Sequence, residues 1–258
     1  MRTPYQRATP VNWAPFAAAE LPPELRRDLA DILTPFYLAT LELERTICRY
    51  ELLIAIGRDR DFVRKIHGTA VAPGMNTIKG CFTTAIVVSL CALFDPDAVS
   101  LQAILNRVLK PEYAEAFRAA NEEDGRGFDV DRQRERLLTL QRRLKRGGAG
   151  KALARIMKLR NQIVAHLDTE PEFSDGYPNG RDMVIVLAAA ANIVVSLTRF
   201  IFPEREIAVP MVRRNARLQA HGFVRAVRPS NLGRITDPNA VGTFFSPGLH
   251  SSTRRNEG

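Results

Sequence analysis

Cysteine, histidine and long apolar segments are all scarce in this sequence of 258 residues. The three cysteines cannot all pair within one chain, so we expect reduced cysteines in the core and a cytoplasmic location. The first residues lack the apolar block of a signal peptide. The longest apolar run, 183–197, is interrupted by Asn192 and falls short of the ~20 residues that a membrane span needs. We therefore expect a buried helix there and no membrane partner.

The same scarcity limits the chemistry of a site. The four histidines are scattered and no cysteine or carboxylate pair stands at ligand spacing, which predicts no metal site and no cofactor. Segment 145–152 fails as a phosphate-binding loop, because Lys145 replaces the first required glycine and Ala152 replaces the hydroxyl residue. No serine or cysteine has the context of a nucleophile elbow. A metal-free acid–base site is the kind of active site that remains.

Apolar residues recur with helical spacing along most of the chain, which predicts an all-α, up-and-down helical bundle. In 23–56 one threonine completes a seam of apolar residues at three- and four-residue intervals. The seam consists of Leu33, Phe36, Thr40, Leu43, Ile47, Tyr50 and Ile54. The acidic segment 95–97 is expected to cap the helix that follows it. Further helices are expected at 76–94, 98–109, 131–146, 151–167 and 181–202.

Composition divides the chain into three parts. Prolines predict a flexible leader at 1–25, helical periodicity predicts one domain at 26–202, and polar composition predicts a basic, largely disordered tail at 203–258. Within the domain, 111–127 begins as a helix but is rich in charge, so we expect an exposed excursion. The glycines within 147–150 predict a break between two helices.

The formal charge of +9 is unevenly distributed along the chain. Residues 132–160 contain eleven basic side chains and one acid, and 203–258 contain nine basic side chains and four acids. The segments 1–131 and 161–202 are each net negative. Because phosphate contacts by Lys and Arg supply most non-specific affinity for nucleic acids, RNA is the expected partner. The alternative is that the arginines of 132–146 form only a solvated helix face.

Arg160 interrupts the apolar seam of the helix expected at 151–167. Leu153 and Ile156 precede it and Ile163 and Leu167 follow it at the same spacing, so position 160 should be apolar. A guanidinium there needs an anionic partner, because burying an unpaired charge costs several kcal/mol. The partner is either a bound phosphate, a helix C-terminus or an acid such as Asp95 or Glu44.

His166 follows Arg160 by six residues. At ~100° and ~1.5 Å per residue, the two side chains lie roughly 120° apart around the helix axis and about 9 Å apart along it. They converge poorly within one helix, whereas two copies related by a two-fold axis can bring both pairs into one cleft. We therefore expect a homodimer. The alternative for His166 is a structural one, in which it hydrogen-bonds the last carbonyl groups of its helix.

Arg160 and Asn161, followed after four residues by His166, resemble the R-N-x(4)-H signature of HEPN domains. Segments 90–95, 100–101 and 159–168 are similar to the abortive-infection U-type branch of that superfamily, and the resemblance covers about residues 30–202. It implies a HEPN-like bundle and a metal-independent endoribonuclease of a toxin or antiviral system. In that case Arg160 contacts the scissile phosphate, His166 transfers protons and Asn161 supports the geometry.

Four further residues of the same helix are candidates for RNA contacts. Lys158 and Gln162 share a stripe with His166, and Arg155 and Lys151 belong to the basic segment. The resemblance also leaves room for a neutralising antitoxin partner. Two alternatives stay open: a non-catalytic HEPN-like module that binds RNA or a nucleotide, and a helical interaction protein in which Arg160 pairs internally.

Overall fold

The computed structural model describes residues 23–69, 71–95, 100–123, 129–165, 180–201 and 209–226, and its regular elements in these ranges are all α-helices. They are α1 (Pro23–Arg58), α2 (Arg60–Ile66), α3 (Val71–Phe94), α4 (Leu101–Val108), α5 (Pro111–Glu123), α6 (Val130–Arg146), α7 (Gly148–Ala165), α8 (Gly180–Ile201) and α9 (Val209–Ala226). The predicted all-α bundle is confirmed. The predictions for 1–22 and 227–258, and those for His166 and the loop 169–179, lie outside the described residues.

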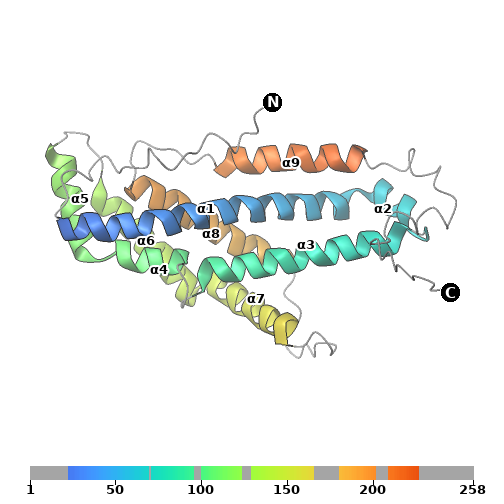
Figure 1. The fold of residues 1–258 in the computed structure, drawn as a ribbon, viewed down its shortest axis with the longest axis horizontal. Helices are drawn as coiled ribbons and strands as arrows, with labels where there is room; N and C mark the ends of the chain where they lie inside the picture. Colours follow the sequence, from blue (N-terminus) through green and yellow to red (C-terminus); the bar gives the residue numbers. More distant parts are fainter. Residues whose placement is uncertain are drawn as a thin grey trace, which may run out of the picture.

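The longest helices run lengthwise side by side. α1 packs between α9 on one side and α3 on the other (Figure 1). α8 packs against α6 and α7, and it also contacts α1, α3 and α4. The apolar sides of these helices meet in one main core that extends from α1 to α8.

The seam predicted for α1 is confirmed at its centre. Phe36, Leu43 and Ile47 are buried, and Thr40 fills its position with the hydroxyl donating to the Phe36 carbonyl oxygen at 2.9 Å. That local hydrogen bond satisfies the hydroxyl, so a polar residue fits an apolar seam without an unpaired group.

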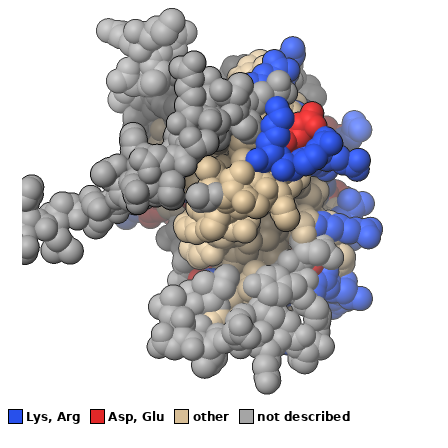
Figure 2. Space-filling view, turned by 90° about the vertical axis from the view of Figure 1, so that its right-hand side faces the viewer, with Lys and Arg blue, Asp and Glu red and all other residues tan. Residues whose placement is uncertain are grey.

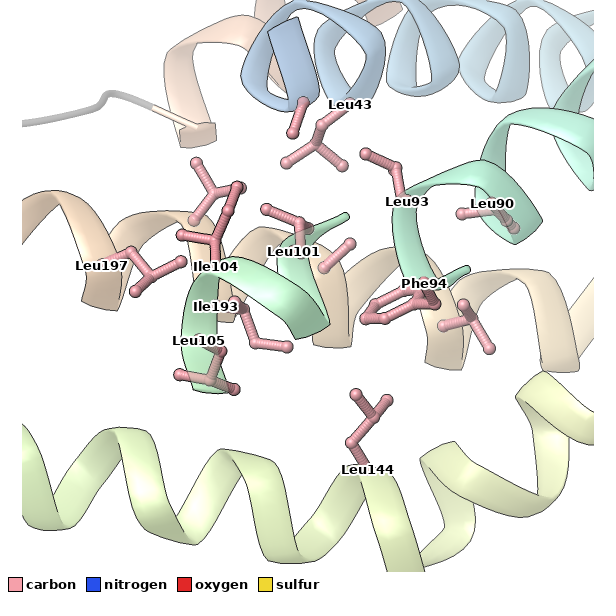
Figure 3. Packing of buried hydrophobic residues seen from close by; sticks show 14 of the residues in the cluster. Leu43, Leu90, Leu93, Phe94, Leu101, Ile104, Leu105, Leu144, Ile193 and Leu197 are labelled. Atoms are coloured by element: carbon pink, nitrogen blue, oxygen red, sulfur yellow. The ribbon is translucent and has the colours of Figure 1, made fainter. Parts of the chain in front are cut away.

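Helix α4 lies inside the core among α1, α3, α6 and α8, as Figure 3 shows. Its buried residues are Leu101, Ile104, Leu105 and Val108. The helix begins at Leu101, with Ser100 accepting from the amide of Ala103 at 3.3 Å. The predicted cap at 95–97 and the predicted start at residue 98 are therefore wrong, because the serine hydroxyl occupies the cap position.

The segment after α4 is held to the bundle at its start. Pro111–Glu123 forms α5, in which Tyr113 and Ala114 are buried. Arg118 joins it to α6 through an ion pair with Asp131 at 2.6 Å. The predicted helical beginning is therefore confirmed, but its first turn is packed on the bundle, so the prediction of an exposed excursion is wrong there; residues 124–127 lie outside the described residues.

The predicted disordered tail from residue 203 is wrong for Val209–Ala226, which forms α9 along α1. Ala216, Ala220 and Val224 are buried at four-residue spacing. Glu51 of α1, whose side chain is 4% exposed, accepts from Nε of Arg213 at 2.7 Å and from Nε of Arg217 at 3.2 Å. Small apolar residues and one buried carboxylate thus dock a helix that carries four arginines.

A tight junction joins α6 to α7. The predicted glycine break is only one residue long, because α7 already begins at Gly148. A Cβ atom added at Gly150 would overlap the carbonyl oxygen of Leu144, whereas one added at Gly148 would meet open space. Gly150 therefore allows the close approach of α7 to the end of α6.

This difference predicts that Gly150→Ala lowers the free energy of unfolding by about 1–3 kcal/mol, since backbone must shift to accept the methyl group. Gly148→Ala is the matched control and should lose no more than about 0.5 kcal/mol, because alanine favours helices. Urea unfolding followed by circular dichroism measures both variants. Equal stability of the two variants would contradict the proposed close approach.

The docking of α9 should depend on pH. Burial raises the pKa of Glu51, but hydrogen bonds from Arg213 and Arg217 outweigh it, and the net pKa is lowered. A lowered folded-state pKa gives stability that is present above the unfolded carboxyl's pKa and is lost as the pH falls through the folded value. Acid should therefore release α9.

We expect Glu51→Gln to weaken this docking by about 1–3 kcal/mol at neutral pH, because the charge-assisted bonds are lost. Amide hydrogen exchange should rise in 209–226 while α6 keeps its protection. Glu115→Gln, at an exposed position of α5, is the control. Unchanged exchange in α9 would show that the carboxylate does not hold the helix.

Candidate functional site

Arg160 lies near the end of α7, at the seam position where the sequence pattern calls for an apolar residue. Ile156 and Leu159, just before it, are buried, but the side chain of Arg160 is 32% exposed. The side chain of Arg160 is therefore partly exposed at the margin of the core.

The contacts of Arg160 leave its charge only weakly balanced. Its Nε and Nη2 donate to Oδ1 of Asn161 at 3.1 and 3.0 Å. Its Nη1 lies 3.5 Å from Oδ2 of Asp95, whose side chain is 31% exposed. An amide oxygen orients a guanidinium without neutralising it, and a single ion pair at this distance between half-exposed groups is weak. Of the two acids considered from the sequence, Asp95 is the one that meets Arg160.

Asn161 is exposed and uses its amide oxygen to hold the fork of Arg160. This contact fixes the direction of the guanidinium from the adjacent position of the helix. Such an arrangement gives Asn161 the supporting geometry that the resemblance implies. Its part in a reaction stays a prediction.

The electrostatics place the end of α3 in the same site. Burial raises the pKa of the Cys91 thiol to about 11, while the nearby charge of Arg160 lowers it and that of Asp95 raises it. Cys91 is therefore protonated at neutral pH and is not a nucleophile. Its response to both charges shows that the end of α3 and the end of α7 share one electrostatic environment.

His166 lies one residue beyond the described part of α7, which ends at Ala165. Its position relative to Arg160 is therefore outside the described residues, and its part in the site stays a prediction. The other predicted RNA contacts lie on the described part of the helix. Lys158 and Lys151 are exposed, and Gln162 is half-buried.

Arg155 has a structural partner. Its Nε donates to Oδ2 of Asp182 at 3.0 Å and its Nη2 donates to the other carboxylate oxygen, which makes the pair bidentate. The side chain of Asp182, in the first turn of α8, is only 5% exposed. The pair ties α7 to α8 and accounts for Arg155 without RNA. No local pattern indicates this pair, because the two residues are 27 positions apart.

A polar network between α1 and α3 was also not indicated by the sequence. Arg49 donates to Glu42 at 2.9 Å and to the hydroxyl of Ser89 at 2.8 Å, and that hydroxyl donates to Glu42 at 2.5 Å. Burial raises the pKa of Glu42, but these hydrogen bonds outweigh it and the pKa is lowered. Every charge in the network has a partner, so it joins two helices and offers no free group for chemistry.

Basic side chains also gather at the end of the bundle that carries α2. Figure 2 views this end and shows Lys and Arg along one edge, around a small acidic area. Arg60, Arg64 and Lys65 of α2 are exposed, and Arg64 pairs with Asp61 at 2.6 Å. Positive surface is therefore not confined to the basic segment 132–160.

Within the ranges that the structure describes, no three His, Cys, Asp or Glu side chains gather as metal ligands. Two described helices, α3 and α8, are long and apolar enough to cross a membrane by length and composition alone. Central helices of a soluble bundle meet the same criterion, and both helices contribute residues to the main core.

One comparison with known proteins agrees with the resemblance to HEPN domains. The model of the AbiU2 family, a HEPN-type family, matches residues 35–203. Comparisons with curated proteins and with solved structures found no match. The matched segment covers well over half of the chain and contains the site at the ends of α3 and α7. The chain belongs to the AbiU2 family of HEPN domains.

Proposed function

We propose that this chain is a metal-independent endoribonuclease of an abortive-infection or toxin system, with Arg160, Asn161 and His166 as its catalytic residues. The observation that carries the proposal is the state of Arg160. Its guanidinium is oriented by a neutral amide, reaches solvent and has one acid at 3.5 Å. A cation held in this way can accept a phosphate.

Another arginine of α7 shows what a structural pair looks like in this fold. Arg155 binds a buried carboxylate through two nitrogens, whereas Arg160 meets a half-exposed carboxylate through one. Burial and bidentate geometry are what make an ion pair structural. Arg160 has neither, which favours a ligand as its functional partner.

The proposed reaction uses a proton carrier and a fixed cation. Neutral His166 takes the proton from a ribose 2′-hydroxyl, because imidazole exchanges protons readily near neutral pH. The 2′-oxygen then bonds to phosphorus, the bond from phosphorus to the 5′-oxygen breaks, and that oxygen takes up a proton from water, while protonated His166 returns its proton to the solvent. Arg160 stabilises the added negative charge on the five-coordinate phosphorus. The products are a 2′,3′-cyclic phosphate and a 5′-hydroxyl.

The proposal includes partners and a location. Because a spacing of six residues predicts that Arg160 and His166 diverge on a single helix, the complete site belongs to a homodimer, in which each copy supplies a pair. Lys158, Gln162 and Lys151 contact the RNA backbone, no cofactor takes part, and the protein acts in the cytoplasm. A neutralising antitoxin completes the system.

One observation favours a second function, a non-catalytic RNA-binding or regulatory module. Asp95 is within ion-pair distance of Arg160, and an acid at this place competes with phosphate. The two functions differ in whether RNA is cut.

Purified protein should cleave RNA in excess EDTA and leave 2′,3′-cyclic phosphate ends. Arg160→Ala and His166→Ala should each lower the rate at least about 100-fold, because each removes a group that acts in the transition state. Arg214→Ala and His221→Ala, at exposed positions of α9, are the matched controls and should keep the parent rate. Equal cleavage by the parent, the site variants and the controls would refute the proposal that this site is a ribonuclease.

Stability should separate the two arginines of α7. Replacing Arg160 by Met restores the apolar seam, so unfolding free energy should change by less than about 1 kcal/mol while cleavage is lost. Arg155→Met leaves the buried carboxylate of Asp182 without this partner and should cost about 1–3 kcal/mol. Thermal unfolding and cleavage are measured on both variants. A large loss of stability in Arg160→Met would assign Arg160 a structural role.

A further inference from the structure

A hollow of about 520 Å³ lies between α6 and α8, apart from the site at Arg160. Arg132, Arg136 and Arg143 of α6 line it, together with Asn192 of α8. All four side chains are exposed. The other lining residues are Glu135, Thr139 and Leu140.

Helical geometry explains why these arginines share the hollow. Positions 132, 136 and 143 differ by four and seven residues, so they lie on one face of α6. Leu137 and Leu144, which are buried in the core, lie about a quarter to a third of a turn away around the helix. At ~1.5 Å per residue, the three arginines span about 16 Å along the axis of α6. They form a row of positive charge along a groove.

The arginines of this row form no ion pairs with acids of the described residues. None of the three arginines has an ion pair or side-chain hydrogen bond among the described residues. The one acid in the lining, Glu135, pairs with Arg142 at 2.5 Å, and Arg142 does not line the hollow. The groove is therefore a site of net positive charge with donors free to bind an anion.

We propose that this groove binds the phosphate backbone of single-stranded RNA. A row of cations spaced along a groove fits an extended polyanion better than a single small anion. Asn192 adds a neutral hydrogen-bonding group from the opposite wall. The choice of RNA rests on the proposed ribonuclease function, and the groove extends the contact with the strand beyond the residues of α7.

The groove and Arg160 lie on consecutive helices. α6 ends at Arg146 and α7 begins at Gly148, and Arg160 is twelve residues, or about 18 Å, further along α7. A strand that contacts both must therefore be several nucleotides long. A dinucleotide reaches only one of them, which separates groove binding from cleavage in an experiment.

The test compares two triple variants that remove the same charge. Arg132→Gln, Arg136→Gln and Arg143→Gln alter the groove, whereas Arg60→Gln, Arg214→Gln and Arg225→Gln alter exposed arginines of α2 and α9. The probe is a fluorescent 20-nucleotide RNA with 2′-O-methyl groups, which cannot be cut by 2′-hydroxyl attack. Circular dichroism confirms that both variants are folded.

The groove variant should bind the probe at least tenfold more weakly than the parent, and the control variant should bind less than threefold more weakly. Because each phosphate contact to a single strand contributes about 0.7 to the salt slope, the groove variant should lose about 2 from its slope. Equal affinities of the two variants for the probe would overturn the proposal that the groove binds RNA. Poly-glutamate serves as a second probe, which mimics an acidic protein. If the groove variant loses binding to poly-glutamate but binds RNA as the parent does, the proposal of an RNA groove is overturned in favour of an acidic protein partner.

This outcome is independent of the ribonuclease proposal. Arg160→Ala removes one phosphate contact and should weaken binding of the uncleavable probe less than about threefold, whereas the groove variant should lose at least tenfold. The groove variant should keep its rate on a dinucleotide, which does not reach the groove. If the parent binds the probe through the groove but cuts no RNA, the groove stands and the proposed catalysis fails. If the groove variant loses the dinucleotide rate as well, the groove is part of the catalytic site and the proposal of a separate site is overturned.

Discussion

The burial of α8 is the constraint on which the rest of the structure depends. Twelve of its 22 residues are buried, and it contacts α1, α3, α4, α6 and α7. Burial on this scale is the main source of stability in a helical bundle. The walls around α8 are also the helices that carry the candidate site and the basic groove, so the positions of both follow from the packing of one apolar helix.

The first turn of α8 shows how this packing admits charge. Asp182 is buried there, and two features stabilise it: the bidentate contact from Arg155 and the partial positive charge of a helix N-terminus. The pair fixes α7 against α8 about one turn and a half before Arg160. Arg160 thus stands on a helix whose orientation is already set by the pair of Arg155 with Asp182, so α7 does not depend on Arg160 alone for its position.

The position of Arg160 costs stability that an apolar residue would supply. The structure limits this cost by leaving a third of the side chain exposed and by using Asn161, a neutral group, to orient it. Asp95 adds a weak opposite charge. A fold that needed the arginine for stability would bury its partner, as it does for Arg155. The local compromise is what one expects of a residue kept for a ligand.

Periodicity predicted the parts of the fold that rest on large apolar residues. The seam of α1 and the burial of α8 were readable because Phe, Leu and Ile recur at helical spacing. Helix α9 was missed because its buried residues, Ala216 and Ala220, are small and stand among arginines, and because its anchor, Glu51, is 162 residues from Arg213. Local patterns cannot show a contact between such distant positions.

The candidate site also has parts that the sequence predicted and one part that it did not. The motif named Arg160 and Asn161, and the apolar seam showed that the arginine needed a partner, with Asp95 among the acids considered. The structural role of Arg155 was not visible, since its partner lies on another helix. The sequence distinguished Arg160 by its motif and its seam position, and the burial of the two partners adds that Arg155 is the structural arginine of the two.

Among the described residues, the basic segment 132–160 contains both paired and unpaired cations. By composition alone, its eleven cations contribute equally to the charge of the segment. In the fold, Arg142 is paired with Glu135, Arg155 is paired with Asp182, and Arg134 donates to the carbonyl oxygen of Leu109. A cation with an acid in contact adds little to the field that a polyanion meets, because the two charges cancel within a few ångströms. The field around α6 therefore depends on the arginines that have no acid in contact, and three of these, Arg132, Arg136 and Arg143, lie on one helix face at the groove.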